Sequence, residues 1–305
     1  MTITKFTRPQ SLEAHDTIGI LSTARAIDTE ELTTSKTFIE SMGYNVIYGA
    51  TIGARHNQYA GDDDLRRNDL QTMIDNPEIK AIICARGGYG TARILSEMDW
   101  SNFKQNPKWI LGYSDVTAIH NTLSNMGIMS MHGIMPINVK DDISKKALSD
   151  ALHIMAGKKS YSLSLPEHPL NHKLNCSGQI TGGNLSMIYS LRGTPHDINP
   201  KGKILFLEDL DEYLYHIDRM ILNLKLGNVL EEVAGIVIGG MSDMNDNTIP
   251  YGKTAEEIIA EHVQEHTPLF FGAPFGHFAH NLPVVCGAEI NITDKDGHWQ
   301  MEFTL

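Results

Sequence analysis

A serine stands at the corner between a predicted strand and a predicted helix. In the stretch ILGYSDVTAIHNTL (110–123) an apolar run ends at a glycine, and Ser114 comes just before a helical pattern begins. Because ligands of open α/β sheets bind at the carboxyl ends of the strands, the Ser114 hydroxyl is well placed for nucleophilic attack. The corner departs from the G-x-S-x-G elbow, since Val116 replaces its second glycine. A serine that caps the helix explains the same residues equally well.

A glycine-rich loop, ARGGYG (85–90), follows another predicted strand. Adjacent glycines let backbone N–H groups converge on an anion, as in an oxyanion hole. If both strands belong to one sheet, the N–H groups of Gly88 and Asp115 would face the hydroxyl of Ser114. The alternative is a tight turn, for which Gly-Gly is sufficient. The loop does not fit G-x-G-x-x-G, and G-x-x-x-x-G-K-[ST] occurs nowhere, so a nucleotide-binding loop is disfavoured.

A nucleophilic serine needs a base, and the base needs a carboxylate to orient it. Among the fourteen histidines, His277 stands out because it follows a strand, in a turn bounded by glycine and proline (APFGHFAHNLP). Glu208 and Asp209 follow the apolar strand of FLED in a similar way. An orienting role suits a carboxylate at that position, while capping the next helix is the alternative for Asp209 or Asp211.

The stretch HVQEH (262–266) fits H-x-x-E-H, a zinc-peptidase pattern. It lies in a predicted amphipathic helix, and the other helical signals of such enzymes are missing. We interpret these histidines as lying at the surface or at the edge of the apolar stripe. We therefore predict no metal site.

The elements that must position these residues alternate in the first half of the chain. Strands are predicted at 17–23, 45–50, 81–85, 109–113 and 128–134, with helical patterns between and after them. This alternation predicts parallel β-α-β units in a sheet covered by helices. The polar, proline-containing segment 158–175 reads as a linker, and the rest is richer in strands. We predict an α/β domain that carries the nucleophile (1–157), a linker (158–175) and a smaller β-rich domain (176–305) that carries Glu208 and His277.

Composition excludes several classes of protein. A formal charge of −12 argues against a nucleic-acid partner, which would require a basic face. Cys84, Cys176 and Cys286 form no C-x-x-C pair, and Cys84 and Cys286 lie in apolar runs typical of the core. The N-terminus lacks the apolar region of a secretory signal, and no apolar run reaches the ~20 residues of a membrane span. The sequence therefore predicts a cytoplasmic protein without a membrane partner.

Together these motifs resemble those of the LD-carboxypeptidase family of serine peptidases, also called muramoyltetrapeptide carboxypeptidases. The matching stretches are RGGYG (86–90), GYSD (112–115) with Thr117 after it, GGNLS (182–186), LED (207–209) with HIDRMILNL downstream, and FGH (275–277) followed by Asn281, Pro283 and Gly287. They extend over nearly the whole chain. Each one is common, but all five in this order are specific.

The resemblance implies a fold, a substrate and an assembly. The N-terminal domain would have a class I glutamine amidotransferase-like parallel sheet covered by helices, and the C-terminal domain would be small and β-rich. The substrate would be a cytoplasmic murein tetrapeptide, cut before its terminal D-Ala. The protein would be a homodimer that needs no metal or cofactor. We add Arg86 and Asn184 as candidate substrate-binding residues.

The resemblance also assigns roles to the residues that carry it. Ser114 would be the nucleophile, His277 the base and Glu208 its orienting partner. Since the triad would come from both domains, the site is expected at their interface. The N–H groups of Gly88 and Asp115 would form the oxyanion hole.

Three rival interpretations follow. Microcin self-immunity enzymes look like LD-carboxypeptidases but cut a peptidyl-nucleotide, and they carry an aromatic residue for base stacking. None of the tryptophans of this chain, Trp100, Trp109 and Trp299, lies in the 158–215 region where that aromatic is expected. A non-catalytic anion-binding protein on the same scaffold is the second rival. A general esterase is the third, and Val116 disfavours it.

Overall fold

The structure is a computed structural model that describes residues 6–305. The chain divides into two compact units. The first consists of the chain up to Lys158 together with Ala279–Val285, and the second of Lys159–Phe278 together with Cys286–Leu305. A short segment near the end of the sequence therefore belongs to the first unit.

The first unit is built on a six-stranded sheet with the strand order β11-β5-β4-β3-β1-β2. Its strands are β1 (Thr17–Leu21), β2 (Asn45–Tyr48), β3 (Ile79–Cys84), β4 (Trp109–Gly112), β5 (Ser130–His132) and β11 (Val284–Cys286). The pairs among β1 to β5 are all parallel. The predicted parallel sheet is therefore confirmed, and β11 is an addition from the far end of the chain.

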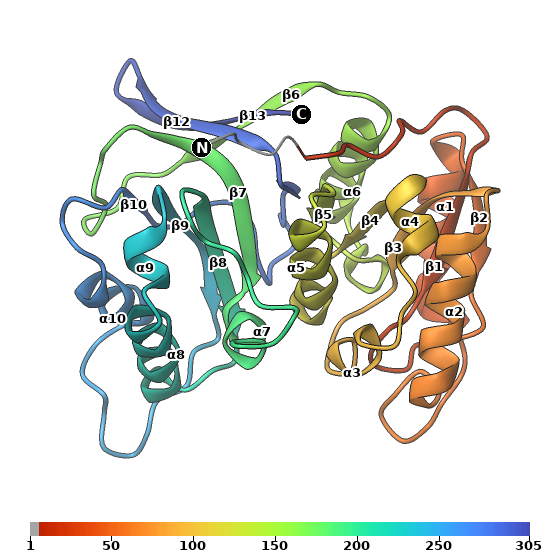
Figure 1. The fold of residues 1–305 in the computed structure, drawn as a ribbon, viewed down its shortest axis with the longest axis horizontal. Coiled ribbons are helices and arrows are strands. Elements are labelled where there is room, and N and C mark those ends of the chain that lie inside the picture. Colours follow the sequence, from red (N-terminus) through yellow and green to blue (C-terminus); the bar gives the residue numbers. More distant parts are fainter. Residues whose placement is uncertain (1–5) are drawn as a thin grey trace. The chain divides into compact units, whose positions relative to one another are not determined.

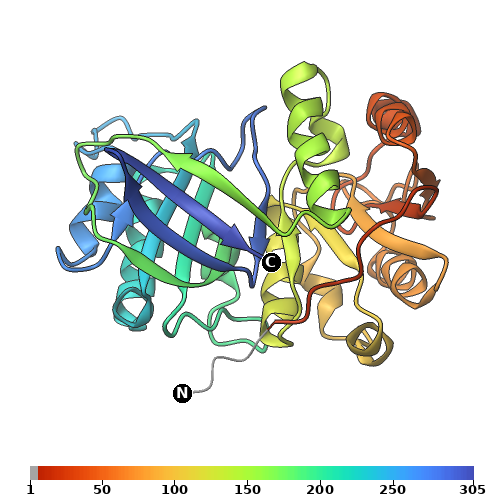
Figure 2. The same cartoon turned by 90° about the horizontal axis from the view of Figure 1, so that it is seen from above.

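Helices cover both faces of this sheet, as expected for parallel strands joined by crossovers. They are η1 (Thr29–Leu32), α1 (Thr33–Ser41), α2 (Asp63–Asp75), α3 (Ala92–Leu95), α4 (Ser101–Gln105), η2 (Ser114–Val116), α5 (Thr117–Asn125), η3 (Pro136–Asn138) and α6 (Asp142–Met155). Figure 2 shows α1 (red) and α6 (light green) on one face and α2 (orange) and α5 (yellow) on the other. Strands β3 and β4 are almost fully buried between them.

The second unit contains a seven-stranded mixed sheet with the order β10-β9-β8-β7-β12-β13-β6. The strands are β6 (Ser160–Leu165), β7 (Cys176–Asn184), β8 (Ile204–Leu210), β9 (Gly235–Ser242), β10 (Leu269–Phe270), β12 (Glu289–Lys295) and β13 (His298–Thr304). β7 to β10 pair in parallel, whereas β6, β13 and β12 extend the sheet with antiparallel pairs.

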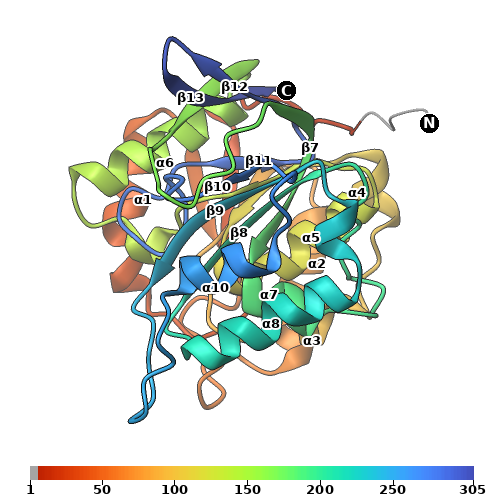
Figure 3. The ribbon, with the colours of Figure 1, turned by 90° about the vertical axis from the view of Figure 1, so that its left-hand side faces the viewer.

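Four helices accompany the parallel part of this sheet: α7 (Leu185–Ser190), α8 (Leu214–Leu226), α9 (Val229–Glu232) and α10 (Ala255–His262). Figure 3 shows α8 and α10 beside β8 and β9. Apolar side chains of these elements form one core, for example Leu205 on β8, Ile236 on β9 and Ile221 on α8. No helix within residues 6–305 has both the length and the apolar character to cross a membrane.

The segment 158–175 is more than a linker, because Ser160–Leu165 form the edge strand β6. Its alternation of serines with Tyr161, Leu163 and Leu165 has the period of a half-buried strand. Two further strands, β7 and β12, were not predicted. β7 carries three glycines, and a Cβ at Gly182 would lie 1.9 Å from the carbonyl oxygen of Phe206 on β8, so close strand approach replaces the usual β-branched pattern.

Candidate active site

Ser114 forms a sharp turn between β4 and α5. Its φ of 62° lies in the left-handed region, which is strained for a residue with a side chain. Tyr113 is the N-cap of η2 and Val116 is the N-cap of α5, so Ser114 caps neither helix. No hydrogen bond joins the Ser114 side chain to another residue of the described chain. The capping alternative is therefore wrong, and the turn presents a hydroxyl without an internal partner.

The glycine-rich loop lies directly against this serine, because β3 and β4 are adjacent parallel strands. A Cβ built on Gly87 would lie 3.0 Å from the Cβ and 3.2 Å from the Oγ of Ser114. Gly88 has a φ of 121°, and its N–H donates to no backbone carbonyl in the described part of the chain. A larger residue at 87 would crowd the side chain of Ser114. The glycine is therefore needed for the close approach of the loop to the serine, and not only to form a tight turn.

The Asp115 carboxylate holds the residue that follows the glycine-rich loop. This carboxylate is buried, and its Oδ2 accepts a hydrogen bond of 2.8 Å from the N–H of Thr91. The fully buried Arg66 also holds the loop, because it donates to the carbonyls of Thr23 at 2.8 Å and Gly90 at 2.9 Å. Burial raises the pKa of Asp115, although the hydrogen bonds from Thr91 oppose the change. The position of the loop is thus set by two buried charged side chains.

His120 on α5 fixes the end of β4. Its Nε2 lies 2.8 Å from the carbonyl oxygen of Gly112, and its Nδ1 lies 2.9 Å from the Oγ of Ser130 on β5. Because a carbonyl can only accept, Nε2 carries the proton and Nδ1 accepts from the Ser130 hydroxyl. Burial lowers the pKa of His120 to about 4, so the ring is neutral near pH 7.

Glu208 and His277 form a buried pair in the second unit. The Nδ1 of His277 lies 2.6 Å from the Oε2 of Glu208, which is fully buried at the end of β8. Burial lowers the pKa of His277, but the charge and hydrogen bond of Glu208 outweigh it, with a smaller contribution from Asp209, so the pKa is raised. A carboxylate on Nδ1 fixes the tautomer and orientation of an imidazole. This pair has the chemistry of an oriented general base.

The turn before His277 lies so close to β8 and β9 that it needs a glycine at position 276. Gly276 has a φ of 129°, and a Cβ there would lie 3.3 Å from the Cβ of Glu208 and 3.1 Å from the backbone nitrogen of Gly240. A side chain at this position would push the turn away from the carboxylate. The glycine therefore contributes to the short Glu208–His277 contact.

Asn184 is hydrogen bonded to Asp209, the residue that follows Glu208. The Nδ2 of Asn184 donates to Asp209 at 2.8 Å, and its Oδ1 accepts from the N–H of Met187 at the start of α7. Asp209 also accepts from the N–H of Ser186, so it serves α7 and not the helix that follows β8. Burial and the adjacent Glu208 raise the pKa of Asp209 to about 7. These contacts hold Asn184 inside the unit, and its role toward a substrate stays a prediction.

Arg86 is half-buried and donates from Nη1 to the carbonyl of Ala26 at 3.0 Å. The RGGYG loop is thereby tied to the segment that follows β1. The predicted site residues are divided between the units, with Ser114, Gly88, Asp115 and Arg86 in the first and Glu208, His277 and Asn184 in the second.

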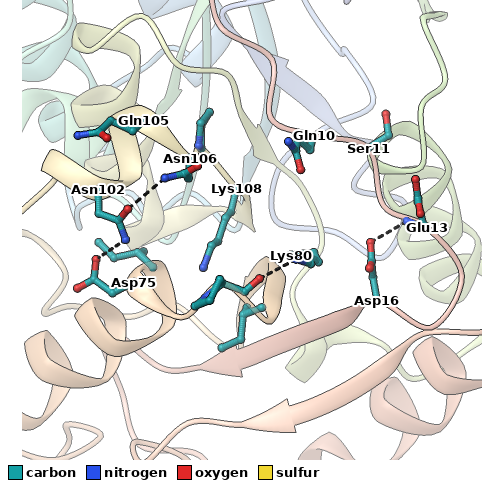
Figure 4. Close-up of a pocket in the computed structure, with 14 residues that line it drawn as sticks. Gln10, Ser11, Glu13, Asp16, Asp75, Lys80, Asn102, Gln105, Asn106 and Lys108 are labelled. Carbon is teal, nitrogen blue, oxygen red and sulfur yellow. Dashed lines mark hydrogen bonds between the residues drawn. The ribbon is translucent and has the colours of Figure 1, made fainter.

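A pocket of about 610 Å³ lies elsewhere, at the amino ends of β3 and β4 (Figure 4). It is the opposite edge of the sheet from Ser114. Figure 4 shows Asn102 hydrogen bonded to Asn106 and to Asp75 in this pocket. Lys108 also lines it, and its Nζ donates to the carbonyls of Met73, at 2.9 Å, and Asn76, near the carboxyl end of α2. This lysine therefore has a structural role, and the pocket contains none of the predicted catalytic residues.

The H-x-x-E-H stretch does not form one helical turn. α10 ends at His262, so His266 lies beyond the helix. The Nε2 of His262 lies 2.7 Å from a carboxylate oxygen of Asp218. Within residues 6–305 no group of three or more histidine, cysteine, aspartate or glutamate side chains is arranged to hold a metal.

Comparison with known proteins agrees with the motifs in this geometry. Residues 18–133 match the LD-carboxypeptidase N-terminal domain, and residues 177–292 match the LD-carboxypeptidase C-terminal domain. The chain is 33% identical to the probable murein peptide carboxypeptidase of Bacillus subtilis, over 94% of this chain and 92% of that protein. The chain belongs to the LD-carboxypeptidase family. The predicted resemblance is confirmed.

Two further relatives illustrate the range of the LD-carboxypeptidase family. The crystal structure of muramoyltetrapeptide carboxypeptidase from Oxalobacter formigenes has the same fold, with a TM-score of 0.85 and 24% identity over 95% of this chain and 99% of that one. The microcin C7 self-immunity protein of Escherichia coli is 26% identical over 75% of this chain and 76% of that protein. Murein peptidases and self-immunity proteins are thus both similar to this chain.

Some residues that shape the candidate site in this member of the family were not found from the sequence. Arg66 stands in a highly charged helix, DDDLRRND, where nothing distinguishes it from the other charged residues. His120 lies in the helix after GYSD, and its position on the buried face was the available signal. Asp209 was considered as a carboxylate that follows a strand or as a helix cap, and its contacts were not predicted because its partners Asn184 and Ser186 are distant in sequence.

Proposed function

We propose that this chain is a serine peptidase that releases the terminal D-Ala from murein tetrapeptides, with Ser114, His277 and Glu208 as its triad. The observation that carries the proposal is the left-handed backbone of Ser114. Such strain in a residue with a side chain is concentrated at functional sites, where it presents the reacting group. Family membership supports carboxypeptidase activity, and the names of the murein relatives support the substrate.

In the proposed mechanism Ser114 Oγ attacks the carbonyl carbon that precedes D-Ala, and His277 Nε2 takes the hydroxyl proton. The carbonyl oxygen becomes an oxyanion that accepts hydrogen bonds from the N–H groups of Gly88 and Asp115. Collapse of this intermediate breaks the C–N bond, and His277 gives its proton to the leaving amine. His277 then takes a proton from water, whose oxygen attacks the acyl carbonyl carbon; collapse of this second intermediate breaks the ester C–O bond, and His277 returns the proton to Ser114 Oγ. Glu208 remains ionised and stabilises the imidazolium.

The proposal includes the finer features that the family implies. These are a glutamine amidotransferase-like first domain, a cytoplasmic location, a homodimer, and catalysis without metal or cofactor. Multi-angle light scattering on the purified protein tests the homodimer, and a mass of one chain would contradict it. Activity after dialysis against EDTA tests the independence from metal.

The alternative is a hydrolase of peptidyl-nucleotides, as the match to the microcin C7 self-immunity protein suggests. All three tryptophans are buried, with at most 8% of their surface exposed, so none can stack on a base. The region 158–215 does contain two exposed aromatic residues, Tyr213 and Tyr215, at its end. They are the residues that this alternative would use.

Mass spectrometry of a diaminopimelate-containing muramoyl-tetrapeptide tests the proposal. Wild-type protein should remove one alanine residue, and Ser114→Ala should lower kcat by roughly 10⁴–10⁶-fold. Ser162→Ala, which changes an exposed serine on β6, is the matched control and should keep full activity.

Three results would count against the proposal. Retention of more than about a tenth of the activity by Ser114→Ala or His277→Ala would discard the triad. Cleavage of a peptidyl-nucleotide but not of the murein peptide would favour the alternative. Binding of either compound without cleavage would favour a non-catalytic protein on this scaffold.

A further inference from the structure

Arg25 differs from the other arginines of the described chain in having no partner. The other eight each contact a carbonyl, a carboxylate or an aromatic ring: Arg8, Arg55, Arg66, Arg67, Arg86, Arg93, Arg192 and Arg219. Arg25 is exposed, and its guanidinium makes no hydrogen bond or ion pair within residues 6–305. An unpaired cation at a defined place is available to an anionic ligand.

The side chain of Arg25 is held against the glycine-rich loop. A Cβ on Gly88 would lie 2.6 Å from both Cγ and Cδ of Arg25 and 3.0 Å from its Nε. The arginine stem therefore occupies the space that the absent side chain of Gly88 leaves. The preceding glycine in turn approaches Ser114, with its Cβ position 3.2 Å from Oγ. Serine, loop and arginine form a continuous series of contacts within the first unit.

The backbone around Arg25 is fixed as well. Its carbonyl accepts a hydrogen bond of 2.6 Å from the hydroxyl of Ser22, and it forms an antiparallel bridge with Tyr59. Arg86 donates to the next residue, Ala26. Arg86, which we had considered as a substrate contact, thus supports the segment that presents Arg25.

The chemistry of the proposed substrate places its terminal carboxylate close to the carbonyl that reacts. In a peptide that loses its last residue, only one nitrogen and one Cα separate the scissile carbonyl carbon from the terminal carboxylate carbon. A group that binds the carboxylate must therefore lie within about one side chain of the oxyanion donors. Arg25 packs on Gly88, whose N–H is the proposed donor, and a planar guanidinium matches a carboxylate in two-point geometry.

We propose that Arg25 binds the terminal carboxylate of the substrate and restricts this enzyme to free C-termini. The inference rests on the proposed function, because it assumes that the cleaved bond is the last one of the peptide. It makes Arg25 a specificity-determining residue, which acts mainly on substrate binding.

The test compares two tetrapeptides that contain diaminopimelate and differ only at the C-terminus, one ending in D-Ala and the other in D-alaninamide. With wild-type protein the free acid should be preferred in kcat/KM. Arg25→Gln should raise KM for the acid by about 10- to 100-fold, as expected for loss of a charge-assisted pair, with a smaller effect on kcat and little effect on the amide. Arg25→Lys should recover part of the preference. Arg55→Gln, an exposed arginine paired with Asp28, is the matched control.

A binding measurement separates this inference from the proposed function. Calorimetry with Ser114→Ala should show tighter binding of the acid than of the amide, and Ser114→Ala/Arg25→Gln should bind both alike. An unchanged acid-to-amide ratio in Arg25→Gln, in kinetics or in binding, would overturn the role of Arg25. Failure of wild-type protein to cleave either peptide would contradict the proposed function, and the calorimetric ratio would still decide the role of Arg25.

Discussion

The raised pKa of His277 depends mainly on Glu208. Burial alone would lower the pKa of its imidazole, and the charge of Glu208, 2.6 Å away, reverses the sign. In the proposed mechanism His277 must be unprotonated to act as the general base, so kcat/KM should rise with pH through this raised pKa. The pH dependence of the reaction therefore reports on the Glu208–His277 pair.

We expect Glu208→Gln to lower kcat by about 10²–10⁴-fold and to move the acid limb of the kcat/KM profile to lower pH. The shift has this direction because the amide removes the charge that raises the pKa of His277 and leaves the burial that lowers it. The profile is measured between pH 4 and 9 with the free-acid tetrapeptide.

Glu212 offers a matched control, because it contacts His216 as another glutamate–histidine pair of the same unit. Glu212→Gln should leave both kcat and the acid limb unchanged. An acid limb that stays in place, or moves to higher pH, in Glu208→Gln would show that His277 is not the group that titrates.

Individual site residues could be predicted when their signal is local in the sequence. The Ser114 corner and the Gly-Gly loop each end an apolar run, and adjacent parallel strands bring such ends together. Arg66 and Asp209 act through partners more than twenty residues away, such as Gly90 and Asn184. Their contacts depend on packing, which leaves no pattern in the sequence.

Among the elements, the longer strands with apolar runs were predicted, whereas β6 and β7, whose composition is unusual, were not. β4 is apolar throughout because helices cover both of its faces. β6 is half serine, and its alternation was hidden by flanking lysines and proline. β7 contains glycine where the neighbouring backbone of β8 leaves no room for a Cβ. Sequence patterns indicate which side chains are buried. A strand that packs through close backbone contact, such as β7, is therefore not predicted from them.

His120 links three elements, because α5 carries it and its ring contacts β4 and β5. Its pKa is about 4 in the folded chain and about 6.5 when unfolded. The unfolded chain therefore binds more protons between these values, and the stability present above pH 6.5 is lost as the pH falls toward 4. We expect a loss of about 2 kcal/mol from this group by pH 5. Urea unfolding of wild type and His120→Gln at pH 7 and pH 5 measures it.

His120→Gln should lose less stability than wild type between these two pH values, since glutamine does not titrate. His153→Gln changes an exposed histidine on α6 and should behave as wild type. Equal losses in wild type and His120→Gln would mean that the ring is not held neutral at the end of β4.

The whole chain is not a simple succession of two domains. The sheet of the first unit receives its edge strand β11 from residues 284–286, after the chain has passed through five of the seven strands of the second unit. The three residues of β11 are all buried, with at most 2% exposed. Sequence reasoning assigned them to the C-terminal domain, because a three-residue apolar strand carries no sign of the sheet to which it belongs. The first unit thus depends on a distant part of the sequence.

A fragment of residues 1–158 should therefore be much less stable than the unit from which it comes. Loss of β11 exposes the edge of β5 and removes the burial of two valines and a cysteine, about 3–6 kcal/mol against a typical domain stability of 5–15 kcal/mol. The comparison is a fragment in which a glycine–serine linker joins residues 1–158 to 279–286, which restores the strand. Thermal unfolding followed by circular dichroism should show a cooperative transition for the extended fragment and a lower, broader one for the bare fragment. Equal transitions would mean that β5 needs no neighbour and that β11 does not stabilise the sheet of the first unit.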